Sequence, residues 1–486
     1  MGIAPLYGII GLTKQINYQK EQLPTMSISY QAENEKTSPK IFKATFDNNT
    51  ASDNLAFSYV ESFKQTIGFL NILRNRLTYL KSSNSTFSTV DIIDYMADAL
   101  ILGYSRFYHM DILRGDKAYA RIKDRKLPSE KVCRDLIREL ALQMPEEAAK
   151  ALRLVSKDIL SQMAELGTAR DVFLDIDDTV CTIYGNQEGA EVGYNPRYKG
   201  RASFKEKLAV ISGTRELVNL TLEGGKHNIQ NGLIDFILSS HALLPESWHL
   251  AGVRMDSGTY SDPVLTFLES RQLKYVIKCK KYEHIRWIIQ TVIAHEHLSP
   301  WQDIDKVFSV NEIYAPLPNY ETLRRFVVVR KNVPVTDQLP LEGALFQYEY
   351  YVIVANMECL TPEEIFHDYN QRCSIETKID ELKEGFAFDN NSRRNQTCNE
   401  LFLLVKMIAY NLHNWFRLSL LPEDLKNCEI TTIRRKLYRV PGNLAGIHPR
   451  YIHIRFPNLP RLKKTIQHII RALKSLMFRK RKLVVC

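Results

Sequence analysis

The 486 residues are 45% hydrophobic and 25% charged, a composition that allows a normal folded core and, by length, about three domains. No uninterrupted apolar run reaches the roughly 18 residues of a membrane span, so no membrane segment is expected. The net charge is +10, but residues 421–486 hold 16 Lys and Arg against three Asp and Glu, which favours nucleic acid as a partner over a merely solvated basic face.

The first third of the chain is expected to be helical. Residues 1–54 become polar toward their end and predict a loosely ordered arm, whereas apolar spacing predicts helices over residues 55–80, 89–107 and 127–140 and another from Pro145. Residues 55–170 therefore predict a helical domain. A helix-turn-helix that binds DNA is one interpretation of residues 108–140, and a helical core without DNA binding is the other.

Strands and helices alternate after residue 170, which predicts an α/β core with a mixed sheet and helices on its faces. Residues 171–280 are interpreted as the first part of this core and residues 349–420 as the second. Residues 281–348, with aromatics, prolines and short apolar runs such as RRFVVVR, predict a β-rich insertion between them. A helix is expected to begin after Thr361, and residues 421–486 predict a helical, basic C-terminal region.

Three aspartates, Asp175, Asp177 and Asp178, follow a short apolar strand in FLDIDDTV. The pattern D-x-D-x-T/V resembles the first motif of haloacid dehalogenase phosphatases, which implies Asp175 as nucleophile and Asp177 as acid/base. That family also needs a late D-x3-D pair, but Asp256 and Asp262 are six positions apart. A second interpretation, a metal ligand for nuclease chemistry, is therefore preferred.

Metal-dependent phosphodiester chemistry needs carboxylates on rigid elements, where two divalent ions about 3.5–4 Å apart activate the attacking oxygen and neutralise the leaving one. Mg²⁺ accepts such oxygen ligands and keeps several waters. Asp177 follows one predicted strand, Asp256 in RMDSG ends another, and Glu376 lies on a predicted helix. These three are the candidate ligands, with Asp177 preferred to Asp178.

Polar residues recur at helical spacing around Glu376 in YNQRCSIETKIDELK. Tyr369, Arg372, Glu376 and Lys383 (here the Y-R-E-K residues) fall at roughly 0°, 300°, 340° and 320° around a helix, within about 60° of one another. A carboxylate beside basic groups on one stripe suits a metal ligand next to a phosphate backbone. An exposed helix with ion pairs along its surface is the alternative interpretation.

The spacing Y-x2-R-x3-E-x6-K resembles the signature of bacterial insertion-sequence DDE transposases. The D-x-T of Asp177 to Thr179, the loop YGNQEGAEVGYNPRYKGR and RMDSG are similar to that family's other motifs. The resemblance implies an RNase H-like catalytic core with Asp177, Asp256 and Glu376 as the metal-binding catalytic triad. It also implies that the other three Y-R-E-K residues contact phosphates of the transposon ends.

Further residues are candidates for DNA contacts. Lys199, Arg201 and Arg254 flank the acidic motifs and are expected to bind phosphate, although exposed basic residues are common. Some relatives stack an insertion tryptophan on a flipped base, which suggests Trp301 for that role. A buried core tryptophan is the alternative.

The expected function is that of a transposase. It would bind the terminal inverted repeats, cut DNA with two Mg²⁺ or Mn²⁺ ions, and direct the released 3′ hydroxyl at target DNA. A homodimer on double-stranded DNA is implied by the resemblance. Eight scattered cysteines without a CxxC pair indicate reduced thiols, as in a cytoplasmic, nucleoid-associated bacterial protein. A catalytically inactive, transposase-derived DNA-binding protein is the remaining alternative.

Overall fold

The computed structural model describes residues 48–79, 84–167, 169–318, 322–334, 346–372, 374–448 and 451–485. The predicted arm of residues 1–54 lies almost entirely outside this part of the chain. From Thr50 onward the residues cluster as one unit, and all elements below belong to it.

The chain up to residue 167 is helical apart from one short strand. Its elements are β1 (Ala51–Ser52), η1 (Leu55–Phe57), α1 (Ser58–Ile67), α2 (Phe69–Arg76), α3 (Thr89–Leu102), α4 (Phe107–Gly115), α5 (Lys117–Lys123), α6 (Glu130–Gln143) and α7 (Pro145–Glu165). Helix α3 begins at a capping box of Ser88 and Asp91. The single helix predicted over residues 55–80 is wrong, because Gly68 adopts φ +71° and separates α1 from α2. That residues 108–140, which run from α4 into α6, form a helix-turn-helix that binds DNA stays a prediction.

The described residues place ten strands in one mixed sheet, in the order β3-β4-β2-β6-β7-β11-β10-β9-β8, with β5 also paired to β4. The strands are β2 (Arg170–Thr182), β3 (Glu191–Val192), β4 (Ala202–Ile211), β5 (Leu217–Gly224), β6 (Trp248–Met255), β7 (Lys274–Lys278), β8 (Gln302–Asp303), β9 (Phe308–Pro316), β10 (Leu323–Pro334) and β11 (Phe346–Ala355). Strands β2, β6 and β7 are parallel, whereas β4 and β11 join them antiparallel. The mixed α/β sheet expected from the sequence is confirmed.

Residues 281–348 begin with a helix that the sequence interpretation did not include, α10 (Glu283–Ala294). The expected strands then follow as β8, β9 and β10. They extend the main sheet, because β11 pairs with both β10 and β7. The boundaries of an insertion here stay a prediction.

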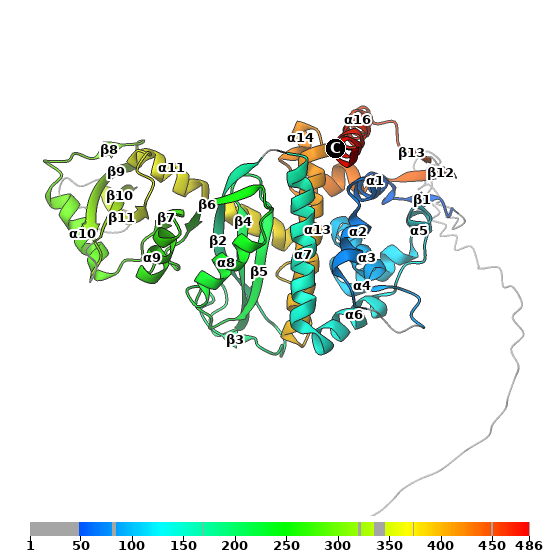
Figure 1. The fold of residues 1–486 in the computed structure, drawn as a ribbon, viewed down its shortest axis with the longest axis horizontal. Helices are drawn as coiled ribbons and strands as arrows, with labels where there is room; N and C mark the ends of the chain where they lie inside the picture. Colours follow the sequence, from blue (N-terminus) through cyan, green and yellow to red (C-terminus); the bar gives the residue numbers. More distant parts are fainter. Residues whose placement is uncertain are drawn as a thin grey trace, which may run out of the picture. The chain divides into compact units, whose positions relative to one another are not determined.

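Helices cover both faces of the sheet (Figure 1). On one face, α8 (Leu233–Ala242), α9 (Asp262–Ser270) and α10 share a hydrophobic core with the inward side chains of β2 and β6. On the other face, α11 (Pro362–Arg372) packs on β7, β9 and β10, and α12 (Ser374–Asp380) packs on β2. The π-helical segment η2 (Glu381–Gly385) continues α12.

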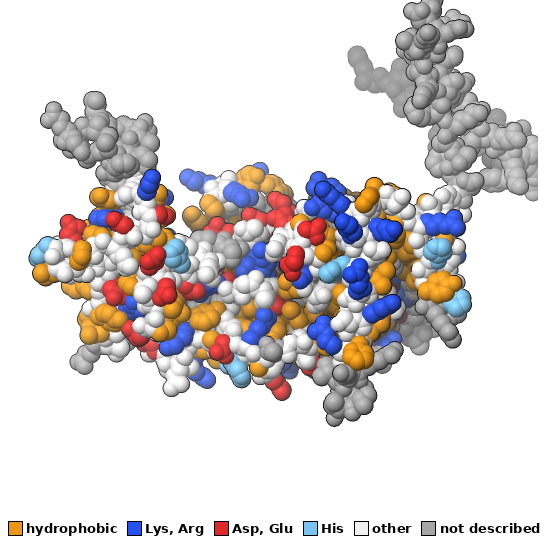
Figure 2. All heavy atoms as spheres, turned by 90° about the horizontal axis from the view of Figure 1, so that it is seen from above, with side chains coloured by type: hydrophobic (Ala, Val, Ile, Leu, Met, Phe, Trp, Pro, Cys, Tyr) orange, Lys and Arg blue, Asp and Glu red, His pale blue; other side chains and the backbone are white. Residues whose placement is uncertain are grey.

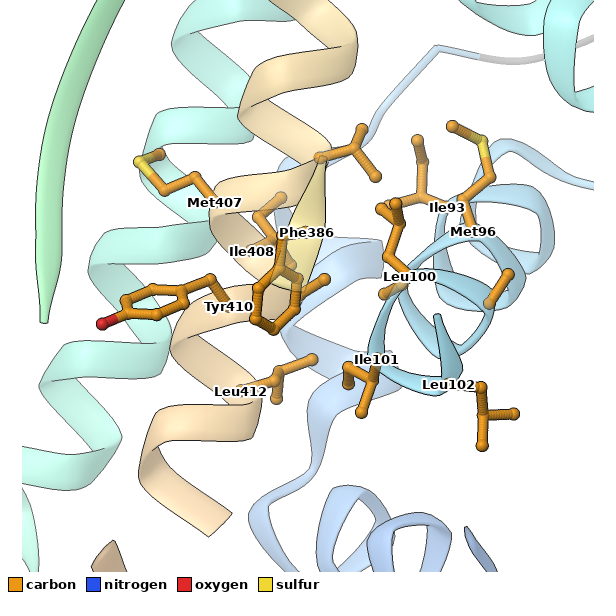
Figure 3. Packing of buried hydrophobic residues seen from close by; sticks show 14 of the residues in the cluster. Ile93, Met96, Leu100, Ile101, Leu102, Phe386, Met407, Ile408, Tyr410 and Leu412 are labelled. Atoms are coloured by element: carbon orange, nitrogen blue, oxygen red, sulfur yellow. The ribbon is translucent and has the colours of Figure 1, made fainter. Parts of the chain in front are cut away.

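Helix α13 (Gln396–Leu420) joins the sheet to the N-terminal helices. It packs against α3, α6, α7 and β5, and it is buried along almost its whole length. Figure 3 shows Met407 and Ile408 of α13 and Leu100 of α3 in this core, beside Phe386, which follows η2. The segment that leads from α12 into α13 is therefore anchored in a hydrophobic core.

The C-terminal region contains a hairpin as well as the expected helices. Its elements are α14 (Glu423–Lys426), α15 (Ile430–Ile433), η3 (Arg434–Tyr438), β12 (Gly442–His448), β13 (Tyr451–Arg455) and α16 (Pro460–Val485). Leu462, Ile469 and Leu473 bury one face of α16, which packs on α1 and α13. In the described part of the chain, none of the helices combines the length and apolarity that crossing a bilayer requires.

Candidate active site

Two of the predicted acids are neighbours across the parallel strands β2 and β6, at the point where the pairing of these two strands ends. Ile176 on β2 is in register with Met255 on β6, and the next residues are Asp177 and Asp256. The sequence interpretation, in which β2 ends before its aspartates, is wrong. The strand continues to Thr182 because β4 pairs with it throughout this stretch. Asp177 is therefore held by a regular strand and not by a loop.

Asp177 contacts one of the Y-R-E-K residues. Its Oδ2 lies 2.7 Å from Nη2 of Arg372, and the Asp177 side chain is 14% exposed. Burial raises the pKa of Asp177 to about 7; Arg372 opposes this shift, and the charges of Asp256 and Asp178 add to it. Burial therefore outweighs the ion pair with Arg372 and disfavours the charged form of Asp177 unless a further cation binds.

Asp178 faces the other side of β2, because successive side chains of a strand alternate. Its Oδ2 lies 3.5 Å from Nζ of Lys205 on β4. Burial raises the pKa of Asp178, Lys205 opposes this, and Asp256 adds to it. Lys205 was not singled out in the sequence, since only strand pairing brings it here. The contact with Arg372 supports Asp177 as first ligand, which stays a prediction.

Asp256 begins a tight turn directly after β6. Its Oδ1 accepts a hydrogen bond from the backbone N–H of Gly258 at 2.9 Å, and its carbonyl oxygen accepts one from the hydroxyl of Thr259 at 2.7 Å. These bonds restrict the carboxylate to one orientation at the strand end. The sequence RMDSG, read as a strand followed by a turn, contained this signal.

The Y-R-E-K residues differ in exposure, so the alternative interpretation of an exposed helix surface does not hold for all four. Tyr369 and Arg372 on α11 are 6% and 5% exposed, whereas Glu376 on α12 is exposed. Lys383, on η2, donates a hydrogen bond from Nζ to the carbonyl of Val180 on β2 at 3.4 Å. The described elements here are α11, α12 and the π-helical η2, and the π-helical turn that carries Lys383 departs from the regular helix that the spacing assumed.

The donor set suits a hard divalent cation only in part. Asp177 and Asp256 offer carboxylate oxygens, the ligands that Mg²⁺ prefers, and they are close enough for Asp256 to affect the pKa of Asp177. Within the described ranges, no three His, Cys, Asp or Glu side chains gather into a group that could hold a metal ion. The exposed side chain of Glu376, which has no hydrogen bond or ion pair to the described residues, therefore forms no such group with Asp177 and Asp256.

Asp175 is buried rather than placed for nucleophilic attack. It is 0% exposed, and its carboxylate accepts hydrogen bonds from Nε and Nη2 of Arg254 at 2.7 and 3.2 Å. A phosphatase nucleophile must reach its substrate, so the haloacid dehalogenase interpretation is not favoured. Arg254 itself is 2% exposed and fully occupied here, and we do not retain it as a DNA contact.

Lys199 and Arg201 lie on an exposed loop after β2. Asn195 fixes this loop: its Nδ2 donates to the hydroxyl of Thr182 at 2.8 Å, and its Oδ1 accepts from a backbone N–H within the loop. The guanidinium of Arg201 lies 5.2 Å from the ring of Tyr184. Both basic side chains are accessible to a phosphate backbone next to the strand that carries Asp177.

Trp301 lies beside β8 and is half-buried. Its Nε1 donates a hydrogen bond to Glu296 at 3.0 Å. The guanidinium of Arg330 lies 4.5 Å from the Trp301 ring and 4.7 Å from that of Tyr348. Trp301 thus belongs to a cation–π group on the extended part of the sheet, and its stacking on a base stays a prediction.

Comparisons with known proteins identify the family of this chain. Among solved structures, the chain is similar to a piggyBac transposase in a synaptic complex with hairpin DNA, at 13% identity and a TM-score of 0.41, over 80% of this chain and 79% of that one. No curated protein matches the chain. A family model, transposase DDE domain group 1, matches residues 36–478 and so includes both acidic strands and the helices after them. With almost its whole length matched, the chain belongs to the transposases with a DDE domain of group 1.

Proposed function

We propose that the chain cuts and joins DNA at the ends of a mobile element, using an RNase H-like core. The strands of this core would be β5, β4, β2, β6 and β7, which lie in this order with β2, β6 and β7 parallel. The observation that carries the proposal is the meeting of Asp177 and Asp256 with Arg372 from the Y-R-E-K residues.

The chemistry assigned to this site is in-line displacement at phosphorus. Asp177, Asp256 and Glu376 would hold two Mg²⁺ or Mn²⁺ ions, which activate the attacking oxygen and neutralise the leaving one. Since cleavage by water and attack by the released 3′ hydroxyl are the same kind of displacement, one site serves both. Arg372, paired with Asp177 here, would exchange this carboxylate for a DNA phosphate when the acids bind metal.

Phosphate contacts would surround the acids. Lys383 is held at the carboxyl-terminal half of β2 by its bond to Val180, and Tyr369 lies on α11 beside Arg372. Lys199 and Arg201 supply accessible positive charge on the neighbouring loop. Such contacts hold the backbone in register without selecting a base sequence. We assign base stacking to Trp301.

We also assign contacts with duplex DNA to the basic C-terminal region. On α16, opposite the buried face, exposed basic side chains gather, and no Asp or Glu occurs in this helix. They are Arg461, Lys463, Lys464, Arg471, Lys474 and Arg479. Figure 2, which looks onto this side of the molecule, shows Lys and Arg side chains gathered in the area of α16. Pairing of two transposon ends would need a homodimer on DNA.

A cleavage assay tests the proposal. The full chain is incubated with duplex DNA that carries the element's own terminal repeats, in Mg²⁺ or Mn²⁺, beside Glu376→Gln and the control Asp380→Asn. Asp380 lies on the same helix, is exposed and makes the same change of charge. We expect cleavage by wild type and Asp380→Asn, and none by Glu376→Gln.

Two outcomes would contradict the proposal in different ways. Cleavage by Glu376→Gln at the wild-type rate would remove Glu376 from the triad. Tight binding of the repeats by the wild-type chain, with no cleavage in either metal, would identify a DNA-binding protein that has lost its catalytic activity.

A further inference from the structure

Three buried charged side chains lie beneath the proposed metal ligands. Each is two positions in sequence from one of the three acids, and they are exposed by 0%, 2% and 3% of their surface. They are Asp175 on β2, Arg254 on β6 and Lys378 on α12, and we call them the ion-paired layer.

Strand geometry places two members of the layer directly below the acids. Residues two apart on a strand face the same side of the sheet, so Asp175 shares a face with Asp177, and Arg254 shares one with the position of Asp256. Asp175 and Arg254 are also partners in the parallel register of β2 and β6. On β2 and β6, the ion-paired layer therefore lies two residues before the acidic site, on the same face of the sheet.

One carboxylate connects the three elements that carry the triad. Asp175 accepts two hydrogen bonds from Arg254, at 2.7 and 3.2 Å, which tie β2 to β6. Its Oδ2 also lies 3.6 Å from Nζ of Lys378, which ties β2 to α12. Among the described residues Lys378 Nζ has no hydrogen bond, so Asp175 is the anionic group that holds this ammonium in the interior.

Arg254 extends the layer to the helix that carries Tyr369 and Arg372. Its Nη1 donates to the carbonyl oxygen of Asp368 on α11 at 2.9 Å and to the carboxylate of the same residue at 3.1 Å. Its Nη2 donates to the hydroxyl of Ser212, the residue after β4. The guanidinium thus joins four segments of the chain at one point.

We propose that the ion-paired layer is a positioning device that sets where Glu376 stands relative to Asp177 and Asp256; this inference rests on the proposed function. Charged groups are costly to bury, and a hydrophobic layer would support the sheet equally well. A charged layer instead fixes distances and directions between β2, β6, α11 and α12. Asp175 and Lys378 are positioning residues, acting on metal binding through the elements that they join.

Metal affinity separates positioning from a purely structural role. The test titrates the full chain, without DNA, with Mn²⁺ and measures free Mn²⁺ by electron paramagnetic resonance. For Lys378→Met, which keeps the side-chain length but removes the charge, we expect a dissociation constant higher by about tenfold to a hundredfold, the usual effect of losing a residue that supports metal ligands. Lys378→Arg restores the charge and is expected to recover most of the affinity.

A matched control is available in the N-terminal helices. Glu61, Lys64, Asp94, Asp98 and Lys123 form a second buried ion-pair group, here called the helical cluster. Lys64 is 2% exposed, as deeply buried as Lys378, and ion-pairs only within the helical cluster. Lys64→Met should lower the melting temperature at least as much as Lys378→Met, yet leave the Mn²⁺ dissociation constant within twofold of wild type.

The outcomes distinguish this inference from the proposed function. If wild type binds Mn²⁺, Asp177→Asn abolishes binding and folded Lys378→Met binds like wild type, the positioning role is overturned and the function stands. If wild type binds no Mn²⁺ at all, the positioning role and the proposed function are both contradicted. Should Lys378→Met fail to fold, Asp175→Asn, which keeps the shape of the carboxylate, is judged by the same criterion.

Discussion

The helical cluster and the acidic site both bury carboxylates, but Asp94 in the first and Asp177 in the second differ in whether nearby cations outweigh the cost of burial. In the helical cluster, burial alone would raise the pKa of Asp94, yet Lys64 and Lys123 outweigh it and hold that pKa well below its ordinary value. At the acidic site, burial raises the pKa of Asp177 to about 7 although Arg372 opposes it. A buried charge is therefore no sign of function by itself. A raised pKa alone is no sign either, since burial also raises the pKa of Asp98 in the helical cluster. At Asp177 the raised pKa coincides with a second carboxylate, Asp256, beside it at the end of β6, where a divalent cation would supply the missing charge.

The largest effect that we expect is the loss of DNA cleavage when a carboxylate of the acidic site is replaced. Asp177→Asn should reduce DNA cleavage by on the order of 10³-fold or more, because several kcal/mol of metal-dependent charge stabilisation would be lost. The folded chain should not become less stable, since the substitution removes a carboxylate that burial and neighbouring acids disfavour. Cleavage rates and urea midpoints of the same preparations check both statements. Cleavage within tenfold of wild type would exclude Asp177 as a ligand.

The same substitution in the helical cluster should have the reverse result. Asp94→Asn removes a buried carboxylate that pairs with Lys64 and Lys123, which keep only Asp98 and Glu61, and we expect the free energy of unfolding to fall by about 3 kcal/mol. Cleavage per folded molecule should be unchanged. Urea denaturation gives the first quantity, and exposed Glu246→Gln, expected within about 0.5 kcal/mol of wild type, is its control. A loss below about 1 kcal/mol would show that the cluster is not balanced as described.

Much of the fold was visible in the sequence because local chemistry determines it. Ser88 with Asp91 marks the start of α3, and Thr361 with Glu364 marks the start of α11, where both hydrogen bonds of a capping box form. The break at Gly68 was missed, because a glycine within a helical pattern is often tolerated. The path of β11 from β10 to β7 was also missed. Residues 278 and 353 become neighbours only through pairing, which no local pattern contains.

The sequence could predict which residues belong to the acidic site, but not their geometry. Predicted strand ends and the resemblance to DDE transposases proposed Asp177, Asp256 and Glu376, but Asp177 was placed after a strand that in fact continues past it. A strand tolerates buried aspartates here because cations from distant segments neutralise them, among them Arg254 and Lys378. Helical spacing likewise assumed one regular helix, whereas Lys383 lies on the π-helical η2, and spacing did not show that Glu376 is exposed while Arg372 is buried. These facts depend on tertiary contacts that a sequence pattern does not contain.

The raised pKa of Asp177 also predicts how the free energy of unfolding depends on pH. The folded-state pKa of Asp177, raised to about 7, lies above its unfolded value of about 3.9. The stability from this group is therefore fully present below about pH 4 and is lost as the pH rises through about 7. Without metal, wild type should lose about 2–3 kcal/mol relative to Asp177→Asn between pH 5 and pH 8. Urea titrations at several pH values measure this difference, and parallel curves for the two proteins would contradict it.

The smallest effect concerns charges that lie outside both buried groups. Lys199 and Arg201 are exposed, so replacing either by alanine should change the unfolding free energy by no more than about 0.5 kcal/mol. If each contacts one phosphate, each variant should make the slope of log affinity against log salt shallower by about one, equally for every duplex sequence. Exposed Lys150→Ala on α7 is the control that should leave the slope unchanged. An unchanged slope for Lys199→Ala and Arg201→Ala would place the DNA elsewhere. A slope that changes for one duplex only would mean that the loop reads bases, because phosphate contacts alone cannot distinguish sequences.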